Sequence, residues 1–376
     1  MENAKISRNQ LFILIVLLEL GSALLVPTAI EAKQDAWLAI LIAMGGGLFL
    51  FSIYLYLFQQ YPDIPLTEYL PVIFGKAAGR FLAFLYVLYF TYIASRLLRT
   101  FGEMLSTIAY RDTPIIITNL LFICVVMYAV RKGIEVLARA GELFFIFLYL
   151  LAISGFILIV VSGLIELNQL RPILEEGFMP VLKSAFTQTL YYPFGEVIVF
   201  AMILPYLNHP KQVKITSMLA LGLSGINLAI VMVINISVIG VDLTVRSPYP
   251  LLSTIQSIQI AKFLERLDVY FMFAMIIGGF FKISLYLYAA AVGAANLFRI
   301  KESARLVFPL GFVILIMSLS IASNSVEHKR EGVELVTVVL HLPFQVIIPL
   351  LLLIVIFLKK RYKNGAMAKG DKEHQG

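Results

Sequence analysis

The sequence is poor in charge. Only 14% of its 376 residues are Asp, Glu, Lys or Arg, whereas 60% are hydrophobic. A soluble domain of this length carries about a quarter charged residues and could not cover so much apolar surface. The apolar residues also fall in blocks of about 18 to 25, the length of a helix that crosses the roughly 30 Å hydrocarbon core of a bilayer. The composition therefore predicts an all-α integral membrane protein.

Residues that build disulfides and metal centres are also scarce. The one cysteine, Cys124, lies inside an apolar block, which excludes an internal disulfide and a cysteine-based metal site. The four histidines are scattered without metal-ligand spacing, and no phosphate-binding loop, zinc-protease motif or serine-hydrolase motif occurs. We therefore expect no catalytic residue, no metal, no cofactor and no enzyme activity. Basic loops, rather than nucleic acid binding, explain the net charge of +7.

The apolar blocks predict about ten transmembrane helices. They form a single transmembrane domain over residues 1–363, with one half over about 9–163, the other over about 184–358, and a disordered polar tail over 364–376. Segments on the amino-terminal side of the membrane carry about twice as many Lys and Arg as the opposite loops, which predicts that both termini are cytoplasmic. The expected spans are 9–30, 36–58, 80–102, 113–130, 140–163, 184–206, 214–240, 268–297, 304–322 and 336–358.

Charged side chains are rare within these spans, and each costs at least about 2.5 to 3.5 kcal/mol at bilayer depth. They are Glu19, Arg96, Arg99, Glu196 and Lys282. A charge placed at this cost marks a functional site unless a structural partner explains it.

Two of the spans are predicted to be interrupted. In span one, Gly21 and Ser22 weaken the helix beside Glu19, and span six carries Tyr191-Tyr192-Pro193-Phe194-Gly195-Glu196 at its middle. Pro193 removes a backbone donor, and Gly195 permits an unusual backbone angle. Corresponding breaks in two halves of five spans are typical of an inverted-repeat transporter, with its substrate site at the breaks.

Structural interpretations stand beside the functional ones. Gly21 could simply pack against a neighbouring helix, and Glu196 could be a protonated, hydrogen-bonded residue. Lys282 could form an ion pair with Glu19 or Glu196, or its ammonium could sit where sodium lies in a cation-coupled relative.

Span three adds a polar helix face. Tyr92, Arg96, Arg99 and Glu103 follow one another at helical spacing. The two arginines could snorkel or pair with Glu103. Tyr92 could line a central cavity or pack.

Short motifs follow one another in a specific order along the chain. The first, ahead of span one, is Ile6-Ser7-x-x-Gln10-Leu11-Phe12. The next three, in the first inner loop, are Gln60-Tyr61-Pro62, Leu66-x-Glu68-Tyr69 and Phe74-Gly75-Lys76. Later come Arg131-Lys132-Gly133-Ile134-Glu135, Arg139-Ala140-Gly141-Glu142 and Pro193-Phe194-Gly195-Glu196. With these motifs the chain resembles, over roughly residues 5–360, the B subunits of spore-germination receptors (GerAB/GerKB type). These form a branch of the amino acid–polyamine–organocation transporter superfamily.

The resemblance implies a ten-helix, five-plus-five inverted repeat of the LeuT-like fold, with helices one and six interrupted. It implies a germinant-sensing subunit in the spore inner membrane, beside an A-type membrane subunit and a C-type lipoprotein, with a small nutrient, often an amino acid, as its ligand. By position the ligand-binding residues would be Gly21, Ser22, Tyr92, Phe194, Gly195, Glu196 and Ser284. Glu19 and Lys282 would form an ion site or couple charge to binding.

Three functions remain compatible with the residues themselves. The first is the nutrient sensor, and the second is a proton-linked amino acid permease that titrates Glu19, Glu196 or Lys282. The third is a membrane scaffold or ion-release element with a vestigial pocket. The family resemblance favours the sensor.

Overall fold

The computed structural model describes residues 5–208, 212–258 and 267–373, with side chains as far as residue 361. Within these residues the chain is helical, and its one β-type pairing is an isolated bridge between Ile6 and Leu207. The first half contains α1 (Arg8–Ala23), η1 (Ile30–Asp35), α2 (Ala36–Gln60), α3 (Leu66–Phe74), α4 (Lys76–Ile108), α5 (Ile115–Arg131), α6 (Ile134–Val161) and η2 (Leu167–Leu170). The second half contains α7 (Phe178–Ser184), η3 (Ala185–Thr189), η4 (Phe194–Met202), η5 (Leu204–Tyr206), α8 (Val213–Arg246), α9 (Pro250–Gln256), α10 (Asp268–Phe298), η7 (Ser303–Leu306), α11 (Val307–Ser320), α12 (Ser325–Glu331), η8 (Gly332–Ile347) and α13 (Ile348–Glu373).

The predicted spans are found in the structure. In the described part of the chain, seven helices are long and apolar enough to cross a membrane, and they correspond to predicted spans two, three, five and seven to ten. The other three are the 16-residue α1, the 17-residue α5, and the segment from α7 to η5. The chain is therefore a multi-pass helical membrane protein, as its composition predicts.

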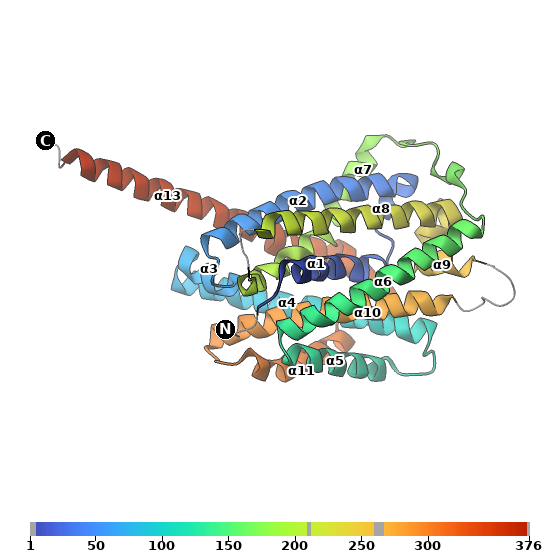
Figure 1. The fold of residues 1–376 in the computed structure, drawn as a ribbon, viewed down its shortest axis with the longest axis horizontal. Helices are drawn as coiled ribbons and strands as arrows, with labels where there is room; N and C mark the ends of the chain where they lie inside the picture. The colour runs from blue at the N-terminus through green and yellow to red at the C-terminus, as the bar shows by residue number, and fades with distance from the viewer. Residues whose placement is uncertain (1–4, 209–211, 259–266, 374–376) are drawn as a thin grey trace.

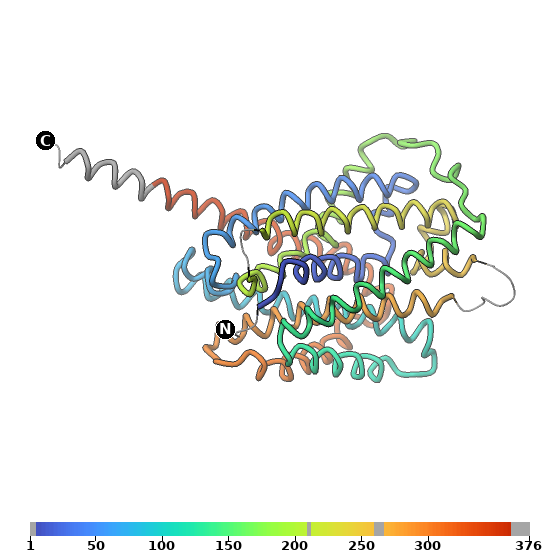
Figure 2. The backbone as a smooth tube through the Cα atoms, viewed as in Figure 1, coloured from blue at the N-terminus to red at the C-terminus, as the bar shows by residue number. Residues whose placement is uncertain are grey.

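The short helix α1 lies in the middle of the bundle (Figure 1). It contacts α6, α8 and α10, while α2 packs along α8 and α4 packs along α10 and α11. The backbone trace shows the start of α1 at one end of the bundle, together with α3 and α13 (Figure 2). Helices α7 and α9 lie toward the other end. Residues from both halves of the sequence therefore surround α1.

The start of α1 is tied to the end of span six. The Gln10 backbone N–H donates to Ser7 Oγ at 3.2 Å, and the Ser7 N–H donates to Gln10 Oε1 at 2.9 Å. This reciprocal pair is a capping box, which satisfies two N–H groups that a helix start leaves free. Ile6 also donates to the Tyr206 carbonyl and accepts from Asn208. The Ile6-Ser7-x-x-Gln10 motif thus has a structural role in this chain: it caps α1 and joins its start to the end of span six.

Span one is interrupted at a different place from the one predicted. The helix continues through Gly21 and Ser22 and ends at Ala23, and residues 24–29 lead irregularly to η1. Gly21 stays helical because it packs against α10: a Cβ built on it would lie 2.6 Å from the Gly278 carbonyl oxygen. Pro27, which lacks a backbone donor, lies in the irregular segment. The break therefore follows Gly21 instead of centring on it.

Span six is interrupted where the sequence predicts it. Helix α7 widens into the π-helical turn η3, residues 190–193 form turns, and the 3₁₀-helix η4 begins at Phe194. The Glu196 N–H donates to the Pro193 carbonyl at 2.9 Å, which restarts helical bonding after the proline. The second half of the span is wound more tightly than an α-helix.

Two segments depart from the expected connections. The first inner loop contains the helix α3, which was not predicted from the sequence. Helix α13 extends to Glu373, into the tail for which disorder is predicted, and the final residues 374–376 lie outside the described residues. The disorder of the tail and the boundaries of the two repeats stay predictions.

Candidate functional site

A polar cavity of about 580 Å³ lies beside the breaks in spans one and six. Its walls come from residues 22–31, α4, the span-six break, the end of α8, and α12 with η8. This volume falls within the range of about 300 to 1,000 Å³ that is usual for small-molecule sites. Its polar lining residues include Ser22, Arg96, Thr189, Tyr192, Glu196 and His341, together with the charged residues Glu31, Glu103, Arg246 and Lys329.

An ion pair lies at the deep side of this cavity. The Lys282 ammonium on α10 donates to Glu196 Oε2 on η4, and both side chains are almost fully buried. The ammonium also stands 4.8 Å from the centre of the Tyr192 ring, within the range of a cation–π interaction. The structure thus selects Glu196, rather than Glu19, as the partner of Lys282, and the buried pair joins α10 to the break in span six.

Glu19 lies close enough to this pair to interact electrostatically with both Lys282 and Glu196. Its carboxyl group is fully buried, and neither oxygen has a hydrogen-bond partner among the described residues. An unpaired buried polar group is costly, so Glu19 has unused capacity to accept a hydrogen bond next to the ion pair. No group of three potential metal ligands gathers there or elsewhere in the described part of the chain.

Gly195 and Phe194 position the break without lining the cavity. A Cβ on Gly195 would lie 2.1 Å from Gln345 Oε1 of η8, so any larger residue there would displace the Gln345 side chain. Phe194 is buried against Gly47 of α2, where a Cβ would lie 2.6 Å from the Phe194 Cβ. The structure places both residues in helix packing, and their contact with a ligand stays a prediction.

Of the other predicted ligand residues, Ser22 and Glu196 line the polar cavity. Tyr92 is only half-buried and lines neither this cavity nor the apolar one described below. Ser284 is fully buried on α10, two residues from Lys282. Gly21 faces the apolar cavity. The predicted residues thus lie around two different cavities, and their contact with a ligand stays a prediction.

The predicted roles of the span-three arginines are resolved in part. Arg99 pairs with Glu103 at 2.5 Å, as the structural interpretation holds, whereas Arg96 donates to the His328 carbonyl of α12 at 2.5 Å. Arg96 thereby closes one wall of the cavity against the start of span ten. At the rim, burial raises the pKa of Tyr249 to about 12, so that this phenol stays neutral.

Sequence reasoning missed the contribution of span ten. Its segment η8 is π-helical over 16 residues, whereas a π-helix is usually a rare single turn within an α-helix, frequently at a functional site. The Tyr54 hydroxyl donates to the Gln345 carbonyl, and the Tyr86 hydroxyl donates to the Phe344 carbonyl at 2.7 Å. These bonds satisfy backbone acceptors of the widened helix from α2 and α4.

A side-chain network extends from the same segment to the cavity wall. The Gln345 amide donates to the Tyr89 hydroxyl and to His341 Nδ1, each at 3.0 Å, and Tyr89 lies 2.9 Å from His341 Nδ1. His341 is the member that lines the cavity. Two polar residues one turn apart, flanking Pro343 in an apolar span, were the signal available in the sequence.

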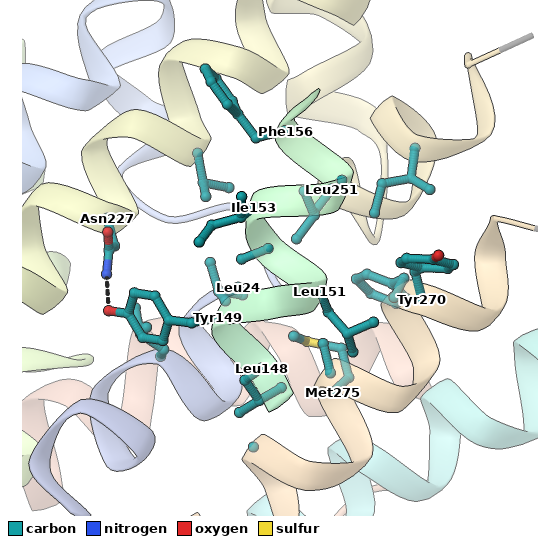
Figure 3. Close-up of a pocket in the computed structure, with 18 of the residues that line it drawn as sticks. Leu24, Leu148, Tyr149, Leu151, Ile153, Phe156, Asn227, Leu251, Tyr270 and Met275 are labelled. Atoms are coloured by element: carbon teal, nitrogen blue, oxygen red, sulfur yellow. Dashed lines mark hydrogen bonds between the residues drawn. The ribbon is translucent and has the colours of Figure 1, made fainter. Parts of the chain in front are cut away.

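A second cavity of about 480 Å³ lies on a different side of α1 (Figure 3). Residues of α1, α6, α8, α9 and α10 line it, and nearly all are aliphatic or aromatic. Its clearest polar feature is the hydrogen bond from the Asn227 amide to the Tyr149 hydroxyl, at 2.7 Å. The chemistry of this cavity is therefore suited to hydrocarbon and not to a polar nutrient.

The arrangement of helices defines a transporter fold. The chain superposes on the crystal structure of MhsT in complex with L-phenylalanine with a TM-score of 0.65, over 95% of this chain and 99% of that one, at 11% identity. This likeness confirms the LeuT-like architecture with interrupted helices one and six that the sequence predicts.

Within that fold, the chain belongs to the spore germination protein family, whose model matches residues 5–326. It is 53% identical to spore germination protein KB of Bacillus subtilis, over 99% of each chain. It is 30% identical to spore germination protein A2 of the same organism, over 80% of this chain and 82% of the relative. These relatives confirm the resemblance seen in the motifs.

Proposed function

We propose that this chain is the nutrient-sensing membrane subunit of a spore germination receptor. It binds a small molecule, an amino acid in the first instance, in the polar cavity between spans one, three, six and ten. The proposal places it in the spore inner membrane with both termini cytoplasmic. There it signals to an A-type membrane subunit and a C-type lipoprotein.

The observation that carries this proposal is the polar cavity ending at the Glu196–Lys282 pair, in a chain closely similar to a germination protein. The cavity is bounded by elements that do not follow α-helical geometry: residues 24–29, the span-six break and η8. A ligand that favours one arrangement of these elements shifts the population toward it, and equal affinity for both arrangements would shift nothing.

The experiment that tests binding is thermal unfolding of the purified chain with a panel of L-amino acids, sugars and nucleosides. A compound that binds the folded state raises the midpoint with its concentration, as mass action requires. We expect at least one amino acid to do so, with the effect reduced in Ser22→Ala. If no compound in the panel moves the midpoint, the chain is not the nutrient-binding subunit.

A second candidate is the proton-linked amino acid permease. The observation in its favour is Glu19, a buried carboxyl group without hydrogen-bond donors beside the ion pair. Vesicles that contain only this chain decide between the two functions. Accumulation of labelled amino acid, driven by an imposed proton gradient and lost in Glu19→Gln, would favour the permease over a sensor that does not transport.

A further inference from the structure

The apolar cavity has a closed inner wall and an open outer side. The inner wall contains Gly21 and Gly278, whose backbones touch where α1 crosses α10. On the outer side, Ile153, Phe156 and Ile230 line the cavity while remaining 54%, 46% and 47% exposed. The cavity therefore opens on the surface that α6 and α8 present to the membrane.

Helix α6 places that opening within the hydrocarbon region. It is 28 residues long, and few of its residues are buried in the protein. The α6 wall of the cavity runs from Phe145 to Ile159, inside a predicted span, and the cavity also reaches Leu251 and Ile255 of α9. At this depth the surrounding medium is acyl chains, and a cavity with apolar walls does not retain water.

The space between α6 and α8 can accommodate an acyl chain. Asn227 and Tyr149 bond to each other at one side of the cavity, which reduces the cost of burying both in hydrocarbon (Figure 3). Gly155, on the same wall of α6, has no neighbouring atom within 4 Å of a built Cβ. The space next to Gly155 is therefore unfilled by the protein itself.

We propose that this cavity is a lipid site, occupied by one acyl chain of a phospholipid from the surrounding bilayer. The chain enters between α6 and α8 and packs against the contact between Gly21 and Gly278. It thereby touches the far side of the elements that build the polar cavity, because Ser22 follows Gly21 and Lys282 lies one turn beyond Gly278. The site is independent of which nutrient, if any, the polar cavity binds.

The test is photocrosslinking of the full chain in vesicles of phosphatidylglycerol and phosphatidylethanolamine. A small fraction of the phospholipid carries a diazirine on its acyl chain, and the labelled peptides are mapped by mass spectrometry. Gly155→Leu fills the unoccupied space with a side chain. The matched control is Gly222→Leu on α8, a half-buried glycine that also has no atom within 4 Å of a built Cβ but does not line the cavity.

We expect wild-type label to concentrate on the peptides that carry Gly21 and Gly278, and to saturate as the probe fraction rises. Gly155→Leu lowers that yield several-fold, and Gly222→Leu leaves it unchanged. Ala152→Leu, on the same cavity wall, provides a second filled variant should the first not accumulate. Label that does not saturate and spreads evenly to exposed α5 residues such as Leu121 would mean annular lipid only and would overturn the site. Equal label in wild type and the filled variants would overturn it too.

Discussion

The two cavities share one wall, α1, and differ in what that helix presents to them. Ser22 lines the polar cavity, and the preceding residue, Gly21, lines the apolar one. Consecutive residues of an α-helix point about 100° apart, so a single helix can serve two environments. On the polar side, α1 ends and the backbone becomes irregular; on the apolar side, it keeps an unbroken glycine contact with α10. Of the irregular residues 24–29, those from Val26 to Ala29 line the polar cavity, whereas Leu24 lines the apolar one.

The comparison also separates two ways of holding a membrane bundle together. Around the polar cavity, charged and hydrogen-bonded side chains from distant spans satisfy one another. Around the apolar cavity, helices approach through glycine and aliphatic contacts, together with interhelical hydrogen bonds from Asn227 to Tyr149 and from Thr254 to Asn235. Because lipid is as apolar as leucine, close packing and not hydrophobicity must stabilise the second region. Substitutions around the two cavities should therefore destabilise the protein for different reasons.

The largest effect is expected at the ion pair. Lys282→Ala leaves Glu196 buried without its countercharge, which should lower the free energy of unfolding by about 3 to 5 kcal/mol. Denaturant titration in detergent micelles measures this, together with the abundance of the variant in membranes. The control is Lys282→Met combined with Glu196→Leu, which removes both charges and should recover most of the loss. Unchanged stability of the single variant would show that Glu196 does not depend on Lys282.

The next effect is expected at the span-six break. Gly195→Leu forces a side chain into the space that Gln345 occupies, and overpacking at this site should cost about 3 kcal/mol. We expect the protein to remain in the membrane while spores that carry it lose their nutrient response. Gly45→Leu, where a built Cβ meets no atom within 4 Å, is the matched control and should respond normally. A normal response from Gly195→Leu spores would show that the span-six break takes no part in nutrient recognition.

A smaller pair of effects compares the two faces of α1 directly. Gly21→Ala brings a Cβ against the Gly278 carbonyl, so α1 and α10 must separate, at an expected cost of about 1 to 2 kcal/mol in stability. Ser22→Ala should change stability by no more than about 0.5 kcal/mol but should reduce ligand-dependent stabilisation. Thermal unfolding with and without the most effective panel compound measures both quantities. If Gly21→Ala instead reduced ligand-dependent stabilisation and Ser22→Ala lowered stability, the ligand would bind in the apolar cavity and not in the polar one.

A similarly small effect on stability is expected in the apolar cavity. Asn227→Leu removes the hydrogen bond to Tyr149, and such interhelical bonds contribute about 0.6 kcal/mol on average. Denaturant titration of Asn227→Leu beside Tyr149→Phe measures this difference, and the two variants should be alike because they remove the same bond. A loss as large as that of Lys282→Ala would mean that the two regions are stabilised in the same way.

The sequence predicted the spans well because the length and apolarity of a span are set by the bilayer and not by neighbouring helices. It also identified Glu196 and Lys282, because a charge in hydrocarbon is conspicuous in any sequence. It could not decide whether Lys282 pairs with Glu19 or Glu196, since that depends on how span eight packs against the other two.

The sequence also did not predict which face of each helix points toward the cavity. Span three is apolar on most of its surface, so its sequence did not show that Tyr89 faces span ten while Tyr92 does not line the cavity. The same uncertainty placed Gly21 and Ser22 at one site. The widened winding of η8 was also beyond prediction, because the hydroxyls of Tyr54 and Tyr86 that satisfy its carbonyls come from residues more than 250 positions away in sequence.

That winding has a mechanical consequence. A π turn takes more residues than an α turn, so rewinding any part of η8 as α-helix would add twist between Gly332 and Ile348. Helix α13 follows directly, and its Lys359 ammonium holds the Ile73 carbonyl at the end of α3, at 2.8 Å. Span ten therefore connects two distant regions of the molecule. Its η8 segment borders the polar cavity at His341, and its α13 segment is bonded to α3 at the opposite end, so a change of winding in η8 would rotate α13 relative to the cavity.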